Sequence, residues 1–241
     1  MINLLDTGVN LCRAYNLGLI EYGKALQLQD NLVSARLAGA IPDTILVLQH
    51  LPVVTLGVSS HESDIIVNRQ WLESKGIEIF RTDRGGGVTF HAPGQLVVYP
   101  IFDLKTRGKD LHLFVRNLEQ AVIRTLKVFS INGYIDPQYP GVWVDNKKVC
   151  ALGIRLIHWI SKHGLALNID NDLGPFSYLI PCGITHRQVT SMSQILGCSL
   201  SFKEIAACLL EQFAGSFDIN IKQESIGGIF SACQRPDIRN G

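Results

Sequence analysis

The spacing of hydrophobic residues along the chain predicts both helices and strands. Apolar residues at steps of three and four are typical of amphipathic helices, whereas alternating or continuous apolar runs of four to eight residues are typical of strands. The first pattern predicts helices over 12–37, 68–76 and 111–129, and a Ser-x-x-Glu capping box at 201–204 predicts one more. The second pattern predicts strands over 44–50, 53–57, 77–82, 95–104, 140–145, 148–157 and 163–169.

These elements are mixed along the chain, and hairpin-like strand runs fill its middle instead of a strict alternation of strand and helix. That order favours an α+β fold, with mixed or antiparallel sheets packed against helices, over a doubly wound parallel sheet. Neither a repeat nor a low-complexity tract nor a linker divides the sequence. We therefore expect a single domain over residues 1–241, and we leave the weakly periodic C-terminal tail unassigned.

The composition is that of an ordinary soluble globular protein, with 46% apolar and 18% charged residues. Lys and Arg number 22 against 21 acidic residues, and this balance predicts neither nucleic acid nor an anionic membrane as the main partner. No apolar run approaches the roughly 18 residues that span a bilayer. Because Met1 is followed by no leader-like segment, we expect a cytoplasmic protein.

Six cysteines occur, at positions 12, 150, 182, 198, 208 and 233. The closest pair, Cys198 and Cys208, has nine residues between its members, so the chain has no CxxC or similar metal-binding pair. A chain of this size without a secretion signal is not a typical disulfide scaffold. We expect reduced thiols and no bound metal.

A glycine-rich segment, RTDRGGGVTFHAPGQLVVYPI, runs from Arg81 to Ile101. Three successive glycines let the backbone approach a ligand closely and expose consecutive N–H groups. The segment is neither a P-loop nor a dinucleotide-binding fingerprint, because no Gly-Lys-Ser/Thr follows and the glycine pattern fails at Phe90. It is either a tight turn or a binding loop, and Arg84 and His91 beside the glycines favour binding.

A second segment, GVWVDNKKVCALGIRLIHWISKHGLALNI, spans Gly141 to Ile169 and has a predicted turn at Asp145–Asn146. Strict alternation after that turn would put Lys148, Cys150 and Leu152 on one strand face and Val149, Ala151 and Gly153 on the other. The small residues at 151 and 153 either leave room for a ligand or let another strand pack closely. Lys148 is either a solvated strand end or a functional amine. His158 and His163 are interpreted as surface or turn histidines.

Two cysteines are candidates for chemistry, Cys150 and Cys182. Cys150 has apolar neighbours on both sides, which raise a thiol pKa and suit an inert core cysteine. Cys182 lies between Pro181 and Gly183 in the stretch IPCGITHRQVTSM. A nucleophile at such a turn is plausible chemistry, but from the residues alone a buried structural cysteine is the favoured interpretation.

Three segments together resemble, in order and spacing, the signature blocks of the lipoyl(octanoyl) transferase family. They are RGGGVTFHAPGQLVVYPI, the block from Gly141 to Ile169, and IPCGITHRQVTSM. The family usually has Tyr-His-Gly-Pro-Gly-Gln where this chain has Phe90-His91-Ala92-Pro93-Gly94-Gln95. Cys150 stands where an alanine is common, which fits a core position. Neither departure removes a proposed catalytic group.

The resemblance implies the α+β fold of biotin and lipoate protein ligases and an acyltransferase that needs no cofactor. The enzyme would move an octanoyl (or lipoyl) group from acyl carrier protein to a lysine of a lipoyl domain, in 2-oxoacid dehydrogenase complexes and in the glycine cleavage H protein. Cys182 would form the acyl thioester with Lys148 as its partner. The acyl pocket would be lined by Arg84, Gly85, Gly86, Gly87, Val88, Thr89, Phe90, His91, Ala151, Leu152, Gly153, Gly164, Leu165 and Ala166.

Lys148 would act in one of two ways, and the sequence leaves both open. An ammonium would lower the pKa of the thiol by its charge, whereas a neutral amine would take a proton from the thiol and then from the incoming lysine. Two rival functions also remain: an ATP-dependent lipoate protein ligase, and a non-catalytic acyl-binding or scaffold relative.

Overall fold

A computed structural model of the chain describes residues 11–180, 188–225, 227 and 229. Within these residues the main feature is one mixed sheet with the strand order β11-β1-β2-β6-β10-β9-β8-β7. Its strands are β1 (Leu11–Ile20), β2 (Asp43–His50), β6 (Gln95–Ile101), β7 (Tyr134–Ile135), β8 (Val142–Val144), β9 (Lys147–Ile157), β10 (Ile160–Asn168) and β11 (Asn220–Glu224). β1 runs parallel to β2 and β11, and the pairs from β2 through β7 are antiparallel.

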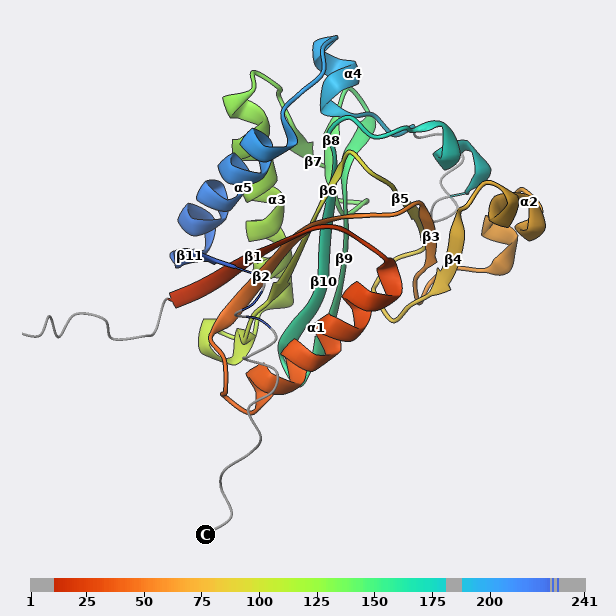
Figure 1. Cartoon of the computed structure of the whole chain (residues 1–241). Coiled ribbons are helices and arrows are strands. Elements are labelled where there is room, and N and C mark those ends of the chain that lie inside the picture. Colours follow the sequence, from red (N-terminus) through yellow and green to blue (C-terminus); the bar gives the residue numbers. More distant parts are fainter. Residues whose placement is uncertain (1–10, 181–187, 226, 228, 230–241) are drawn as a thin grey trace, which may run out of the picture.

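Helices cover both faces of this sheet (Figure 1). α3 (Leu111–Val128) and α5 (Phe202–Phe217) lie on one face and α1 (Tyr22–Leu37) on the other. Both long helices of the first face begin where the sequence predicts. Ser201 accepts a hydrogen bond from the backbone N–H of Glu204, and Asp110 accepts one from that of Leu113, so each side chain satisfies an otherwise unpaired amide at its helix start.

A smaller sheet packs beside α1, in the order β4 (Glu78–Arg81), β3 (Val53–Leu56) and β5 (Val88–His91). The short helix α2 (Arg69–Ser74) covers it, together with the 3-10 turns η1 (Glu62–Asp64) and η3 (Gly174–Tyr178). η2 (Leu104–Arg107) precedes α3, and α4 (Met192–Leu196) precedes α5. The glycine-rich loop joins β4 to β5 and lies between the two sheets.

The predicted helix over 12–37 is wrong in its first half, because residues 11–20 form β1. Cys12 and Ala14 pack toward α3 and α5, whereas Tyr15 packs toward α1, so this strand is buried on both faces. Such a strand carries apolar residues on both sides, and their spacing then imitates a helix. Gly18, with a φ of +63°, marks a shift in the pairing of β1 with β2 before the chain enters α1.

Candidate active site

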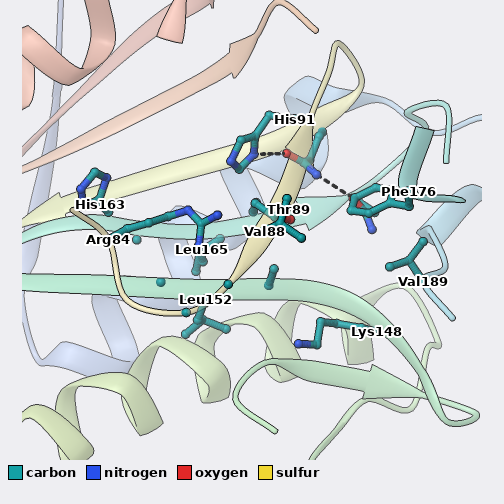
Figure 2. Close-up of a pocket in the computed structure, with 18 of the residues that line it drawn as sticks. Arg84, Val88, Thr89, His91, Lys148, Leu152, His163, Leu165, Phe176 and Val189 are labelled. Atoms are coloured by element: carbon teal, nitrogen blue, oxygen red, sulfur yellow. Dashed lines mark hydrogen bonds between the residues drawn. The ribbon is translucent and has the colours of Figure 1, made fainter. Parts of the chain in front are cut away.

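A pocket lies where β5 and the glycine-rich loop of the small sheet face β9 and β10 of the large sheet (Figure 2). Its void, including the part that opens to solvent, is about 820 Å³. The lining residues are Tyr22, Arg84, Gly86, Gly87, Val88, Thr89, His91, Gln95, Tyr99, Lys148, Ala151, Leu152, Gly153, His163, Gly164, Leu165, Ala166, Asn168, Phe176 and Val189. The structure therefore brings residues from all the predicted acyl-pocket segments to one cavity.

Two residues of the predicted set lie beside this cavity and not on its wall. Phe90 is buried behind it, edge-on to Phe176 at 5.8 Å between ring centroids. Gly85 instead pairs with β9, since its N–H donates to the carbonyl of Ile154 at 3.1 Å.

The glycine-rich loop packs directly on β9 because both partners lack side chains at the contact. A Cβ added to Gly153 would lie 2.8 Å from the carbonyl oxygen of Gly85, closer than atoms can approach without displacement. Of the two interpretations of small residues in this strand, close packing of another segment therefore applies to Gly153. Gly86, whose φ is +87°, turns the loop at the same place.

Arg84 both lines the pocket and braces the loop. Its Nη2 donates to the backbone carbonyl of Thr55 at 2.8 Å, its Nε donates to the Thr55 hydroxyl at 3.1 Å, and its Nη1 donates to the carbonyl of Gly85 at 3.1 Å. The guanidinium is thus tied to β3 of the small sheet. These bonds hold the base of the loop against the strand next to β5.

His91 begins a chain of buried hydrogen bonds that reaches the neighbourhood of Lys148. Gln95 Nε2 donates to the carbonyl of Phe90 and to Asn168 Oδ1, at 3.2 and 2.8 Å, so Gln95 Oε1 is left to accept from His91 Nδ1 at 2.7 Å. Asn168 Nδ2 in turn donates to the carbonyl of Thr190 at 3.0 Å. Burial first, and then the charge of nearby His50, holds the pKa of His91 well below its usual value. His91 is therefore a neutral imidazole protonated on Nδ1.

Lys148 lies at the edge of the pocket, next to the described end of the stretch IPCGITHRQVTSM. The backbone N–H of Lys148 donates to the carbonyl of Gln188 at 2.9 Å, and its backbone carbonyl accepts from the N–H of Thr190 at 3.0 Å. Its Nζ lies 4.8 Å from the centroid of the Trp143 ring, a cation–π distance. Of the two interpretations of Lys148, a freely solvated strand end does not fit this half-buried position beside Trp143.

The face assignment around Lys148 also needs correction. Trp143 pairs with Lys148 but Val142 pairs with Cys150, so Val149 is an extra residue in β9. Val149 and Cys150 both lie in the core beneath α3 and α5. Because of this bulge, Lys148 shares its face with Ala151 and Gly153 and not with Cys150. The turn at Asp145–Asn146 is confirmed, since both residues have positive φ values of 47° and 61°.

The interpretation of Cys150 as a core residue is confirmed. Its side chain is fully buried, and burial raises the pKa of its thiol above the usual range, which makes a thiolate there unfavourable. Cys12, Cys198 and Cys208 are likewise free thiols. Cys182, the predicted nucleophile, lies outside the described residues, as does Cys233.

His163 is the site residue whose environment the sequence prediction missed. The prediction of a surface or turn position is right for His158, which is exposed in the turn between β9 and β10, and wrong for His163, which is 1% exposed. Its Nε2 lies 2.7 Å from Asp83 Oδ1, and burial lowers its pKa to about 4 although Asp83 opposes that shift. Other lining residues absent from the predicted set are Tyr22, Gln95, Tyr99, Asn168, Phe176 and Val189. Four of these six residues, Gln95, Tyr99, Asn168 and Val189, stand in the quoted motif blocks, which are the signal in the sequence that points to them.

Within the described residues, no group of three or more His, Cys, Asp or Glu side chains is placed to hold a metal ion. In the same part of the chain, no helix is long and apolar enough to cross a membrane.

Comparison with known proteins gives the family. Residues 21–214 match the family model described as the lipoyl protein ligase A/B catalytic domain. The octanoyltransferase of Solibacter usitatus is 42% identical over 210 residues, which cover 87% of this chain and 94% of that protein. The octanoyltransferase of Rubrobacter xylanophilus is 46% identical over 182 residues, 75% of this chain and 81% of that protein.

A solved structure agrees with the predicted fold class. The bipartite lipoate protein ligase of Thermoplasma acidophilum superposes with a TM-score of 0.72 over 93% of this chain and 91% of that one. Its sequence identity is 16%, so this likeness concerns the fold alone. The α+β prediction, with mixed sheets packed against helices, is confirmed. By its sequence match over most of its length, the chain belongs to the lipoyl protein ligase A/B catalytic domain family.

Proposed function

We propose that this protein is an octanoyltransferase that moves an octanoyl group from the thioester of acyl carrier protein to a lysine of a lipoyl domain. The observation that carries the proposal is an apolar pocket that extends to Lys148, in a chain whose relatives over most of both lengths are octanoyltransferases. The middle of the pocket is lined by Val88, Ala151, Leu152, Leu165 and Ala166. An aliphatic chain gains about 0.8 kcal/mol for each methylene group that it buries on such a surface.

In the first half-reaction the thiolate of Cys182 attacks the carbonyl carbon of the donor thioester. A new carbon–sulfur bond forms to the enzyme, and the carrier leaves as its free thiol after taking up a proton. The Lys148 amine supports the thiolate, either through its positive charge or by taking the thiol proton and returning it to the leaving carrier thiolate. Lys148 is paired through its backbone with Gln188 and Thr190, and Gln188 follows Cys182 by only six residues in the sequence.

In the second half-reaction the lysine amine of the acceptor attacks the Cys182 thioester. An amide bond forms, the carbon–sulfur bond breaks, and the proton lost by the amine ends on the thiol of the enzyme. Exchange between two thioesters is close to thermoneutral and amide formation is downhill, so neither step needs ATP. The division into two steps at one nucleophile is the usual logic of covalent catalysis.

The specific partners belong to the same proposal. The donor is octanoyl-acyl carrier protein, and the acceptors are lipoyl domains of 2-oxoacid dehydrogenase complexes and the glycine cleavage H protein. The reaction is the first step of protein lipoylation from endogenous octanoate and takes place in the cytoplasm. Residues 1–241 form one catalytic domain in this proposal.

The test is intact-mass spectrometry of the protein after incubation with octanoyl-acyl carrier protein without ATP. We expect an added octanoyl mass on the wild type, none on Cys182→Ser, and an unchanged adduct on the matched control Cys150→Ala, because Cys150 is a buried core residue. An adduct that survives in Cys182→Ser would refute the assigned nucleophile. A requirement for ATP would indicate the lipoate ligase reaction, and failure to transfer any acyl group would indicate a non-catalytic relative.

A further inference from the structure

His163 combines several unusual features at one end of the pocket. It has a φ of +62°, which is rare for a residue other than glycine inside a strand. β10 pairs with β6 only from Leu165 onward, whereas its pairing with β9 continues through His163 to Ile160. The pairing with the β6 segment is therefore interrupted at this residue, and it resumes at Ser161, whose backbone N–H donates to the carbonyl of Phe102 at 2.9 Å. Such conformations persist only where the surrounding structure enforces them, and they cluster at functional sites.

The neighbours of His163 hold it firmly in this conformation. Its N–H donates to Gln29 Oε1 of α1 at 2.8 Å, which replaces a sheet hydrogen bond. Asp83, which accepts from Nε2 at 2.7 Å, is also within 3.3 Å of the Lys162 amine. Because Nε2 donates to a carboxylate and the ring is neutral, His163 Nδ1 is a bare acceptor, and it is buried with no hydrogen-bond partner.

Tyr99 lies against His163 and is fixed equally well. The two rings meet edge to face, with 6.3 Å between centroids and 86° between planes. The Tyr99 hydroxyl lies 2.8 Å from His50 Nε2, while His50 Nδ1 donates to the carbonyl of Ile20 at 3.1 Å. The hydroxyl proton of Tyr99 therefore points to His50. The Tyr99 and His163 rings are each fixed by a hydrogen bond, to His50 and to Asp83.

This pair stands at the opposite end of the pocket from Lys148. In Figure 2, Arg84 and His163 lie at one side of the view and Lys148 at the other, with Val88, Leu152 and Leu165 between them. His163 pairs with Ile154 of β9, six residues after Lys148, and one of those six is the bulge residue. At about 3.3 Å per residue the two positions are roughly 17–20 Å apart.

An octanoyl chain matches that separation. Seven carbon–carbon bonds of about 1.5 Å give an extended chain of about 9 Å, and an extended lysine side chain spans about 6 Å. The remainder of roughly 2–5 Å is comparable to the size of a thioester group and one van der Waals contact. Two more methylenes would add about 2.5 Å and would press the chain into the two rings.

We propose that His163 and Tyr99 form the end wall of the acyl pocket and determine the longest acyl chain that the enzyme accepts. The inference rests on the proposed octanoyltransferase function. The wall excludes longer chains sterically, because both rings are locked by hydrogen bonds to Asp83 and His50.

The test measures kcat/KM for transfer from acyl carrier protein loaded with octanoyl, decanoyl or dodecanoyl groups. For the wild type we expect a fall of tenfold or more from the octanoyl to the dodecanoyl donor. His163→Gly removes the ring and also the unfavourable φ, so it should fold. Each newly buried methylene is worth about a fourfold gain. Because a decanoyl group has two more methylenes than an octanoyl group, we expect the decanoyl-to-octanoyl ratio to rise about fifteenfold in this variant. His163→Gln, which keeps the volume and a donor to Asp83, should leave the ratio near that of the wild type.

Several results would overturn the proposal. A wild type that uses dodecanoyl and octanoyl donors equally well has no end wall at this position. An unchanged ratio in folded His163→Gly, or in His163→Asn as a second small variant that tolerates positive φ, would refute the role of His163 and leave octanoyl transfer intact. A wild type that transfers no acyl group of any length would overturn both the proposed function and the end wall.

Discussion

Asn168→Ala tests whether the buried hydrogen-bond chain supports the position of Lys148. The Asn168 side chain is 4% exposed, its Nδ2 donates to the carbonyl of Thr190 at 3.0 Å, and its Oδ1 accepts from Gln95 Nε2 at 2.8 Å. Thr190, in turn, pairs with Lys148 through its N–H. Truncation leaves the buried carbonyl of Thr190 without this donor, whereas Gln95 Nε2 keeps its bond to the carbonyl of Phe90.

The expected loss of stability follows from these bonds. An unsatisfied buried carbonyl costs about 1–3 kcal/mol, and a net hydrogen bond contributes about 0.5–1.5 kcal/mol. We therefore expect the free energy of unfolding to fall by about 2–4 kcal/mol, within the 5–15 kcal/mol that domains usually have. With a urea m-value of about 3 kcal/mol per molar, the midpoint of unfolding moves down by roughly 1 M. We expect kcat for octanoyl transfer to fall about tenfold, because the backbone beside Lys148 loosens.

The assay is urea denaturation followed by circular dichroism, together with steady-state transfer kinetics. Asn171→Ala is the matched control: Asn171 is also buried, but its Nδ2 makes only a 3.3 Å bond to Asn168 Oδ1, and its own Oδ1 has no partner. This control should lose much less stability and keep its kcat. A midpoint for Asn168→Ala within about 0.2 M of the wild type, or an equal loss in both variants, would refute the reasoning.

Two further predictions concern pH and packing. Burial lowers the pKa values of His50 and His163 from 6.5 to about 4, so the unfolded chain binds more protons between these values, and stability is present above about pH 6.5 and lost as the pH falls toward 4. Each histidine then lowers the free energy of unfolding by roughly 2 kcal/mol at pH 5, and the melting temperature should be about 10 °C lower at pH 5 than at pH 7. The control variant His158→Asn, at an exposed turn, should show the same difference in melting temperature. A melting temperature that rises on acidification would contradict the predicted sign. Gly153→Ala places a Cβ 2.8 Å from the carbonyl of Gly85 and should lower stability by about 1–3 kcal/mol and raise KM for the donor. The control is Gly215→Ala in α5, where the nearest neighbouring atom to the added Cβ is 3.8 Å away, and this variant should raise the melting temperature slightly. Equal effects of the two substitutions would count against a tight contact between the glycine-rich loop and β9.

The sequence alone determined the features that depend on local patterns. The helices α3 and α5, the turn at Asp145–Asn146 and the core position of Cys150 follow from periodicity, turn chemistry and apolar neighbours. The motif blocks also identified most of the pocket wall, because the glycine-rich loop and the two central strands are continuous segments that fold onto one cavity. The role of Cys182 stays a prediction.

Only the tertiary structure decided the features that depend on contacts between distant segments. β1 packs against the core on both faces, so its apolar residues do not show the alternation that would identify a strand. The face of Lys148 depends on one extra residue in β9, which no alternation pattern reveals. The left-handed φ of His163 is enforced by Asp83 and by Gln29 of α1, about 80 and 134 residues away in the sequence. The spacing of apolar residues shows only which face of an element is buried. Bulges and strained residues depend on particular partners far away in the sequence, so they can be recognised only in the folded chain.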